Sequence, residues 1–430
     1  MEGSRDSSTH QIIYRPRLST RYDLWFKQLV SVLARHATGC QASHLGDSWW
    51  ARKQMRGITN SRHIVHCSTE QPLTARRSPV HIMLRDVGIL VMSTNPWFTT
   101  ADLPPELQQL AATNGAADTD TALLNAFVST VLRSRDLERG DVKVMHRAVR
   151  ELRYALSVFA RYRHIRKVTV FGSARAAVSH PAYGLAKAFA QRMVAAGFMV
   201  ITGAGDGMMR AAQEGAGRAH SFGLNILLPF EQQANDIIIN DPKLVYFKYF
   251  FTRKLIFVKE TNAFALFPGG FGTHDEAFEA LTLLQTGKSA LMPVVFIEAP
   301  GSTYWQDWVE FLKRHMLSEG FISASDLHLF KVTRDIDAAV EEITTFYHNY
   351  HSSRYVDGQL LIRLQRSPSA DLLARLNRDF RDILSQGDMV AVEPPGDPAD
   401  EAPELPRLLL WFNRMHYGRL RQMLDVLNQH

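Results

Sequence analysis

Residues 146–350 alternate between short apolar runs and longer amphipathic segments, and this alternation constrains the fold more than any other feature of the chain. The apolar runs KVTVFGSA, FMVITGAG, SFGLNILLP, NAFALFPGG and MPVVFIE predict strands. The segments between them, such as PAYGLAKAFAQRMVAAG and THDEAFEALTLLQTGK, have the length and apolar spacing of helices. Strands without a polar face are buried on both sides, so the pattern predicts a doubly wound, Rossmann-like α/β domain with a parallel sheet flanked by helices.

A chain of 430 residues is too long for one small domain, and we expect an extension on each side of this core. Residues 1–145 are mixed: RYDLWFKQLVSVLARHA and ALLNAFVSTVLRS predict helices, and VHIMLRDVGILVMST predicts a strand. Residues 351–430 predict a small α+β appendage. Both extensions lack a recognisable set of catalytic side chains.

Composition indicates a soluble globular protein, with 46% hydrophobic and 21% charged residues. No apolar run approaches the roughly 20 residues that span a bilayer, and the polar start MEGSRDSSTHQ is unlike a signal peptide. Cys40 and Cys67 make no metal-type pair and require no disulfide. We therefore expect a cytoplasmic protein with no membrane partner and no metal.

Basic residues are concentrated in the first third of the chain, where residues 1–167 hold 24 Lys and Arg against 14 Asp and Glu. Such a surplus is compatible with binding to nucleic acid. However, no zinc-finger spacing and no aromatic-glycine RNA-binding motif accompanies it. We interpret the arginines of segments such as RAVRELRYALSVFARYRHIRK as solvated helix faces, and do not expect a nucleic-acid partner.

Three glycine-bearing turns each follow a predicted strand: FGSAR (171–175), TGAGDGMM (202–209) and PGGFGTHDE (268–276). In open parallel sheets, ligands bind beyond the carboxyl ends of the strands. Glycine lets the backbone approach a ligand, and helix N-termini favour anions. The dinucleotide fingerprint G-x-G-x-x-G is absent, because Met208 occupies its last position. Three converging turns predict a phosphate-bearing ligand, with candidate binding residues Ser173, Gly203, Gly205, Gly207, Gly269, Gly270, Gly272 and Thr273.

The pair Arg253–Lys254, followed downstream by the segment from Pro268 to Glu276, resembles the signature of the Lonely Guy (LOG) family, long labelled "possible lysine decarboxylase". That signature is an Arg-Lys on a helix and then P-G-G-x-G-T-x-x-E. The resemblance covers roughly residues 165–320. The loop GAGDGMM departs from the commoner G-G-G-x-x-G-L-M.

The resemblance implies an enzyme that cleaves the N-glycosidic bond of a nucleoside 5′-monophosphate and releases the base and ribose 5-phosphate. The base is adenine-like or, in plant members, a cytokinin. The resemblance further implies a homodimer or higher homo-oligomer, whose subunits often complete each other's cleft. We expect no cofactor.

The residues of the signature suit this chemistry. A carboxylate such as Glu276 can stabilise an oxocarbenium-like sugar and order its hydroxyls or water. Thr273 precedes Glu276 by three residues, so both face one side of a helix, and Thr273 with the neighbouring amides can hold the 5′-phosphate. Arg253 can orient Glu276, bind the phosphate or stabilise the departing base, and we place Lys254 with the substrate-binding residues. The competing interpretation is a plain ion pair between Arg253 and Glu276.

Other residues of these turns have structural explanations of equal or greater weight. Ser173 and Arg175 can contact phosphate or base, or only cap a helix. Asp206 is best explained as a turn-forming residue. We expect Asp275 to be a solvated charge pointing away from the cleft, and His274 to be exposed.

The end of the same predicted helix carries Gln285, Thr286 and Lys288. These side chains can line the cleft of a partner subunit. A helix C-cap at Gly287 explains them nearly as well.

Three other functions compete with this prediction. Lysine decarboxylation needs a lysine Schiff base to pyridoxal phosphate with its anchors, and Lys254 adjoins Arg253 without such surroundings. A dehydrogenase would need the dinucleotide glycines and an acid after the second strand. The remaining alternative is a non-catalytic carrier or sensor of nucleotides or molybdenum cofactor, and the presence of both Arg253 and Glu276 favours the enzyme over it.

Overall fold

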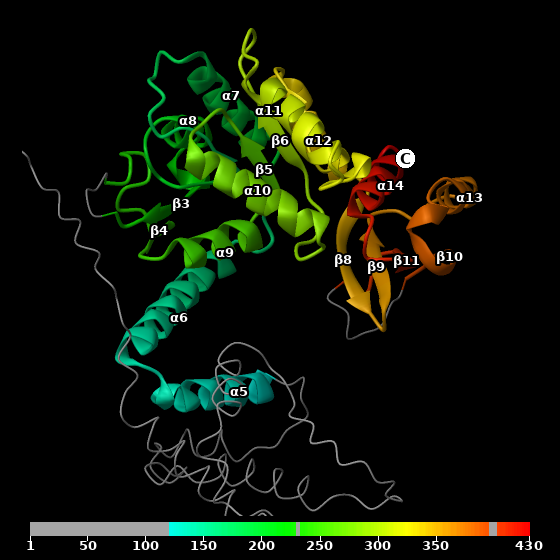
Figure 1. Cartoon of the computed structure of the whole chain (residues 1–430), viewed down its shortest axis with the longest axis horizontal. Coiled ribbons are helices and arrows are strands. Elements are labelled where there is room, and N and C mark those ends of the chain that lie inside the picture. The colour runs from blue at the N-terminus through cyan, green and yellow to red at the C-terminus, as the bar shows by residue number, and fades with distance from the viewer. Residues whose placement is uncertain (1–119, 229–232, 395–401) are drawn as a thin grey trace, which may run out of the picture. The chain divides into compact units, whose positions relative to one another are not determined.

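The computed structural model describes residues 120–228, 233–394 and 402–430, and contains a seven-stranded sheet (Figure 1). The strand order is β4-β3-β2-β1-β5-β6-β7, and every neighbouring pair is parallel. The strands are β1 (Lys167–Phe171), β2 (Met199–Thr202), β3 (Ser221–Ile226), β4 (Leu244–Phe247), β5 (Ala263–Leu266), β6 (Val294–Ile297) and β7 (Lys331–Thr333). The predicted Rossmann-like parallel sheet is confirmed.

The central strands are buried on both faces, which explains why their sequences show no alternation of polar and apolar residues. Every residue of β1, β2, β5 and β6 is buried. In β5, Phe264 and Leu266 pack into one hydrophobic core, whereas Ala263 and Ala265 pack into the core on the opposite face.

Helices cover both faces of the sheet (Figure 1). The face of Phe264 is covered by α6 (Arg139–Ala160), α9 (Phe250–Glu260), α10 (Phe271–Gln285) and α11 (Tyr304–Leu312). The other face is covered by α7 (Pro181–Ala195), α8 (Met208–Ala216) and α12 (Ile336–Phe346). Local sequence sets where helices begin: Pro181 opens α7, and the His180 ring accepts a hydrogen bond from the Ala182 amide at 3.1 Å.

The two edge strands, β4 and β7, were not indicated by the sequence. Each is only three or four residues long, and β7 has no fully buried residue. β7 contains a single apolar residue, Val332, so its sequence lacks the apolar run that is typical of a buried strand.

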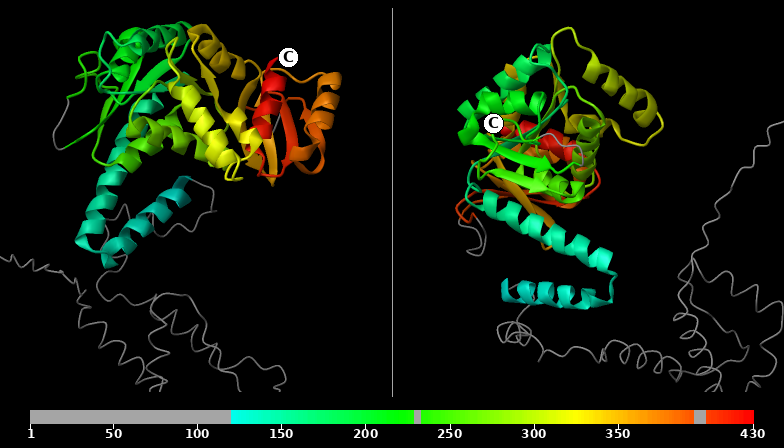
Figure 2. Two further views of the ribbon diagram at one scale, coloured as in Figure 1. Left: turned by 45° about the horizontal axis from the view of Figure 1, so that its top comes forward. Right: turned by 90° about the vertical axis from the view of Figure 1, so that its left-hand side faces the viewer.

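The C-terminal part is α+β, as predicted (Figure 2). It contains an antiparallel sheet of order β10-β11-β9-β8 and two helices. The elements are β8 (Tyr350–Val356), β9 (Gln359–Leu364), α13 (Ala370–Asp379), β10 (Leu384–Val392), β11 (Arg407–Phe412) and α14 (Tyr417–Asn428). One hydrophobic core continues from Phe264 under the parallel sheet to Leu410 and Leu424 in this part. The domain boundaries at residues 145 and 350 stay predictions.

The N-terminal predictions fall largely on residues 1–119, which lie outside the described residues together with 229–232 and 395–401. The helix over 21–37 and the strand over 80–94 belong to this part. The helix expected around 122–134 is confirmed as α5 (Asp120–Arg133). No helix in the part of the chain that the structure describes is long and apolar enough to cross a membrane.

A buried carboxylate joins α6 to the beginning of α9. Glu151 is 5% exposed and accepts hydrogen bonds from the Thr252 hydroxyl at 2.7 Å, the Lys248 amide at 2.8 Å and the Arg147 guanidinium at 2.7 Å. Burial alone would raise the pKa of Glu151, but these hydrogen bonds outweigh it and lower the pKa below 4.5. The position of α9 therefore depends on a residue in the middle of α6.

We predict that Glu151→Ala lowers the free energy of unfolding by about 1–3 kcal/mol, because it leaves the Lys248 amide and the Thr252 hydroxyl without this acceptor. Urea denaturation measures the change. Since the pKa is lowered on folding, the stabilisation is present above the ordinary pKa of 4.5 and is lost as the pH falls through the lowered value. Glu341→Ala, at an exposed position of α12, is the control. Equal destabilisation by both variants would contradict the prediction.

Candidate active site

The three glycine-bearing turns lie side by side, because the strands that precede them, β2, β1 and β5, are neighbours in the sheet. The Ser173 amide donates to the Pro268 carbonyl at 3.1 Å, and the Met208 amide donates to the Ser173 carbonyl at 3.0 Å. Gly207 has a φ of 62°, and a Cβ atom there would lie 2.2 Å from the Ser173 oxygen. Glycine is required here for contact between the turns.

A cavity of about 750 Å³ opens beside these turns and extends between α9 and α10. This volume is within the range of small-molecule sites. The predicted residues in its wall are Ser173, Arg175, Gly203, Arg253, Gly269, Gly270, Gly272, Thr273, His274 and Glu276.

Three predicted binding residues are outside this wall. Gly207 packs on Ser173, and the Gly205 carbonyl accepts a hydrogen bond from the Asn235 side chain at 2.8 Å. The Lys254 ammonium lies 3.0 Å from the Asp275 carboxylate and also pairs with Glu279. These three residues therefore do not line the cavity.

Helix α10 places its catalytic candidates as the spacing predicted. Thr273 and Glu276 are 6% and 7% exposed and both face the cavity, whereas the Asp275 side chain is 60% exposed. Burial raises the pKa of Glu276 to about 7, although the charges of Lys254, whose ammonium lies 3.9 Å away, and of Arg253 act in the opposite direction. Asp275 is not simply solvated, since it pairs with Lys254.

Arg253 presents a guanidinium whose buried Nε atom has no hydrogen-bond partner in the structure. Its side chain packs over the rings of Phe250 and Phe257, with the guanidinium carbon 5.0 and 5.6 Å from the ring centroids. Burial lowers its pKa, and the charge of Glu276 opposes this effect. Within the described residues no ion pair connects Arg253 with Glu276, so the plain ion pair considered above is not formed. A buried donor of this kind is satisfied by an ordered water or by a ligand.

The N-terminus of α10 forms the end of the cavity nearest to the P-G-G turn. The amides of Thr273 and His274 donate to the Gly270 carbonyl at 3.0 and 3.2 Å, so neither is spare for a ligand. The first amides of a helix have no acceptor within it. The groups at this helix end that remain available to an anion are therefore the amides of residues 270–272 and the Thr273 hydroxyl, rather than the Thr273 amide.

A tyrosine that the sequence did not indicate anchors the P-G-G turn. The Tyr304 hydroxyl donates to the Gly269 carbonyl and lies 2.7 Å from Nε2 of His274. His274 is half-buried, with its ring centroid 5.5 Å from that of Trp305, so the expectation that it is exposed was wrong. Burial lowers the pKa of His274, and its neutral ring can donate Nε2–H to Tyr304.

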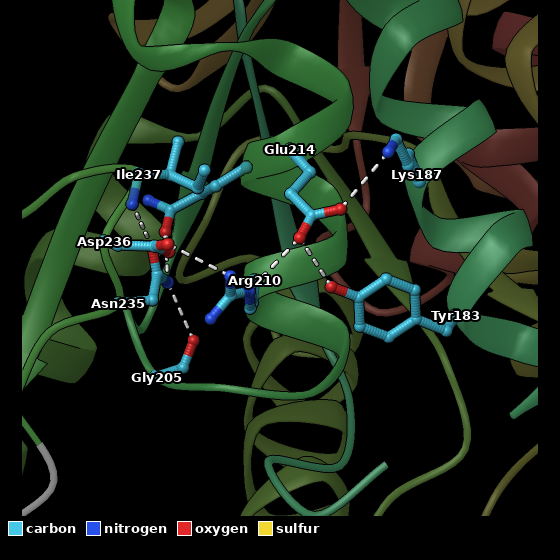
Figure 3. A network of polar contacts seen from close by, with 9 residues as sticks. Tyr183, Lys187, Gly205, Arg210, Glu214, Asn235, Asp236 and Ile237 are labelled. Atoms are coloured by element: carbon cyan, nitrogen blue, oxygen red, sulfur yellow. Dashed lines mark hydrogen bonds and ion pairs between the residues drawn. The ribbon is translucent and has the colours of Figure 1, made fainter. Parts of the chain in front are cut away.

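A second supporting network holds the turn after β2 (Figure 3). The backbone amide of Asn235 donates to the Ala204 carbonyl at 2.9 Å, and the side-chain amide of Asn235 donates to the Gly205 carbonyl at 2.8 Å. Ala204 has a φ of 59°, which costs energy in a residue with a Cβ atom and requires such fixation. Nearby, Glu214 accepts hydrogen bonds from Tyr183 and Arg210 at 2.9 and 3.1 Å. Asn235 belongs to an irregular segment, so periodicity could not reveal it.

Two of the residues predicted at the end of α10, Gln285 and Thr286, form hydrogen bonds within the chain. Gln285 donates to Asp326 at 2.7 Å, and the Thr286 hydroxyl donates to the Thr282 carbonyl at 2.7 Å. Gly287 follows with a φ of 65°, which is typical of a helix C-cap. Among the described residues, no group of three His, Cys, Asp or Glu side chains is arranged to hold a metal ion.

Comparisons with known proteins bear on the same region. A protein-family profile described as "Possible lysine decarboxylase" matches residues 206–343, a span that includes Arg253 and Glu276. No curated protein matches the chain.

Several solved structures are similar to part of the chain. The molybdenum cofactor carrier protein from Chlamydomonas reinhardtii is 20% identical over 42% of this chain and 98% of its own, with a TM-score of 0.30. The molybdenum cofactor binding protein from Rippkaea orientalis is 17% identical over 42% of this chain and 95% of its own, with a TM-score of 0.31. DNA processing protein A from Helicobacter pylori is 12% identical over 44% of this chain and 85% of its own, with a TM-score of 0.32.

We predict that Glu276 makes folding less favourable as the pH rises. Since its pKa is raised from 4.5 to about 7, its contribution to stability is fully present below pH 4.5 and is lost as the pH rises through about 7. Replacement by glutamine removes this loss, so the stability of Glu276→Gln relative to wild type should grow between about pH 5 and pH 8, by up to about 3 kcal/mol.

Thermal unfolding across this pH range checks the prediction. Asp275→Asn, one position away and exposed, is the matched control and should show no such growth. A constant difference between Glu276→Gln and wild type at every pH would contradict it.

Proposed function

We propose that the protein hydrolyses the N-glycosidic bond of a nucleoside 5′-monophosphate, such as AMP, to the free base and ribose 5-phosphate. The observation that supports this most is the cavity itself, which combines a buried carboxylate, a buried guanidinium with an unpartnered Nε and a helix N-terminus. A phosphate and a sugar that develops positive charge need these groups together. The profile match over residues 206–343 is consistent with this proposal.

In this proposal each group has one role. The 5′-phosphate binds the first amides of α10 and the Thr273 hydroxyl. Ionised Glu276 faces the ribose and stabilises the positive charge that develops on C1′ as the bond to the base breaks. Water supplies hydroxide to C1′ and a proton to the departing base, so atoms and charge balance.

In the proposed complex the departing base lies beside Arg253 and the aromatic side chains of the cavity. Arg253 stabilises negative charge on the departing base. Phe250 and Phe271 line the cavity and are 51% and 96% exposed, so their rings are available to stack on a planar base. The pKa of Glu276 near 7 makes its charge responsive to pH in the neutral range.

The proposed enzyme acts as a homodimer. Large apolar side chains are exposed on α9 and at the start of α10, including Phe251 at 55%, Leu255 at 51% and Phe271 at 96%. Contiguous exposed apolar groups beside a site are typical of an interface, and a second copy that covers them would also narrow the cavity. Sedimentation velocity should give twice the mass of 48.6 kDa, and a monomer at micromolar concentration would contradict the dimer.

Incubation with AMP, followed by chromatography for adenine and ribose 5-phosphate, tests the activity. We predict that Glu276→Gln lowers kcat by about 10²–10³-fold while AMP still binds, because the neutral amide keeps the shape of the carboxylate but not its charge. Arg253→Lys should also be impaired, since an ammonium cannot reproduce the fork geometry. Adenosine should be a poor substrate, because it lacks the phosphate that the α10 amides hold.

Asp275→Asn is the matched control for the carboxylate. If it inactivates the protein as strongly as Glu276→Gln, the catalytic carboxylate has been wrongly assigned. Tight AMP binding without adenine release would instead favour the carrier or sensor alternative.

A further inference from the structure

A second cavity, of about 150 Å³, lies where the C-terminal sheet meets the end of α10. Its wall combines the loop over residues 287–291 with β8, β9 and α14. Nothing in the proposed reaction uses this cavity, and it includes Lys288, a residue that the active site does not contain.

The wall of this cavity is rich in groups that bind anions. It contains Lys288 and Arg354 but no Asp or Glu. Its hydroxyl groups belong to Ser289, Tyr350, Ser353, Tyr355 and Tyr417. The charge of Lys288 and these hydroxyl groups favour a ligand that is negatively charged and accepts several hydrogen bonds.

Four of these hydroxyl groups form two hydrogen-bonded pairs, and each pair can still donate one hydrogen bond. The Tyr355 and Tyr417 oxygens lie 3.1 Å apart, and the Tyr350 oxygen lies 2.9 Å from that of Ser353. Each pair spends one hydroxyl hydrogen on its internal bond, so one hydrogen of each pair is left for a further acceptor.

We propose that this cavity binds a small phosphate monoester. At about 150 Å³ the cavity is much smaller than the cavity of about 750 Å³ at the proposed active site, which favours a small ligand. The three terminal oxygens of a phosphate can use more of the available donors than the two of a carboxylate. Leucine side chains at Leu291, Leu360 and Leu424 complete the wall and accept a short carbon body.

Helix α10 connects this cavity to the active site. Helix α10 carries Thr273 and Glu276 near its beginning, and the loop that follows it forms the cavity wall. At Gly287 a Cβ atom would lie 1.9 Å from the Tyr417 hydroxyl, so this loop is pressed against α14. A ligand that orders the loop also restrains the end of α10, which makes the cavity a site for an effector. This inference does not depend on the proposed reaction.

Titration calorimetry of the full-length protein with glycerol 3-phosphate tests the proposal, with glycerol and propionate as neutral and carboxylate probes. Lys288→Gln should weaken one binding event about tenfold or more, since it removes a charge-assisted contact at an exposed position that folding does not need. Lys313→Gln, an exposed lysine of another surface, is the matched control and should bind as wild type does. Thr273→Ala should leave this event intact, which separates it from phosphate binding at the active site.

Hydrogen exchange gives a second measurement. Glycerol 3-phosphate should slow amide exchange in 280–291 of the wild-type chain but not of Lys288→Gln. Binding that Lys288→Gln leaves unchanged, or that Lys313→Gln weakens equally, would overturn the proposal. Propionate binding as tightly as glycerol 3-phosphate would overturn the assignment to a phosphate ester.

Discussion

The contact between three backbone turns at the carboxyl edge of the parallel sheet is the constraint on which the rest of the site depends. Ser173 is hydrogen bonded through its amide to the turn after β5 and through its carbonyl to the start of α8. These bonds form only because Gly207 has no side chain to separate the turns. The N-terminus of α10 lies at this contact, and the guanidinium of Arg253 reaches the same cavity from α9. Sheet order and glycine positions together produce the cavity.

The electrostatics of the cavity follow from unequal burial. Lys254 pairs with the exposed Asp275 and with Glu279, so its charge is largely compensated at the edge of the site. Glu276 is left with a single cation at 3.9 Å, and its desolvation dominates. Asp275, Glu276 and Glu279 lie within five positions of α10 but differ in side-chain exposure, which is 60%, 8% and 34%. Arg253 likewise has a buried Nε donor without a hydrogen-bond partner in the structure.

The sequence predicted those parts of the fold and of the site that have a strong local pattern. Buried strands such as β5 and the i, i+3 relation of Thr273 and Glu276 are encoded by neighbouring residues, and the structure has both. Tyr304, Asn235 and Glu151 could not be predicted, because each acts on a segment more than 30 positions away or in an irregular loop. His274 was misjudged because its burial comes from α11, which contacts it only through tertiary packing. The contacts that support the site form only in the folded chain, whereas the glycine-bearing turns can be recognised in the sequence.

A single carboxylate, that of Glu151, connects α6 to the beginning of α9. Because that carboxylate holds the backbone at Lys248 and the side chain of Thr252, it fixes the residue that directly precedes Arg253. A substitution at position 151 would therefore disturb the position of the Arg253 guanidinium as well as the stability of the fold.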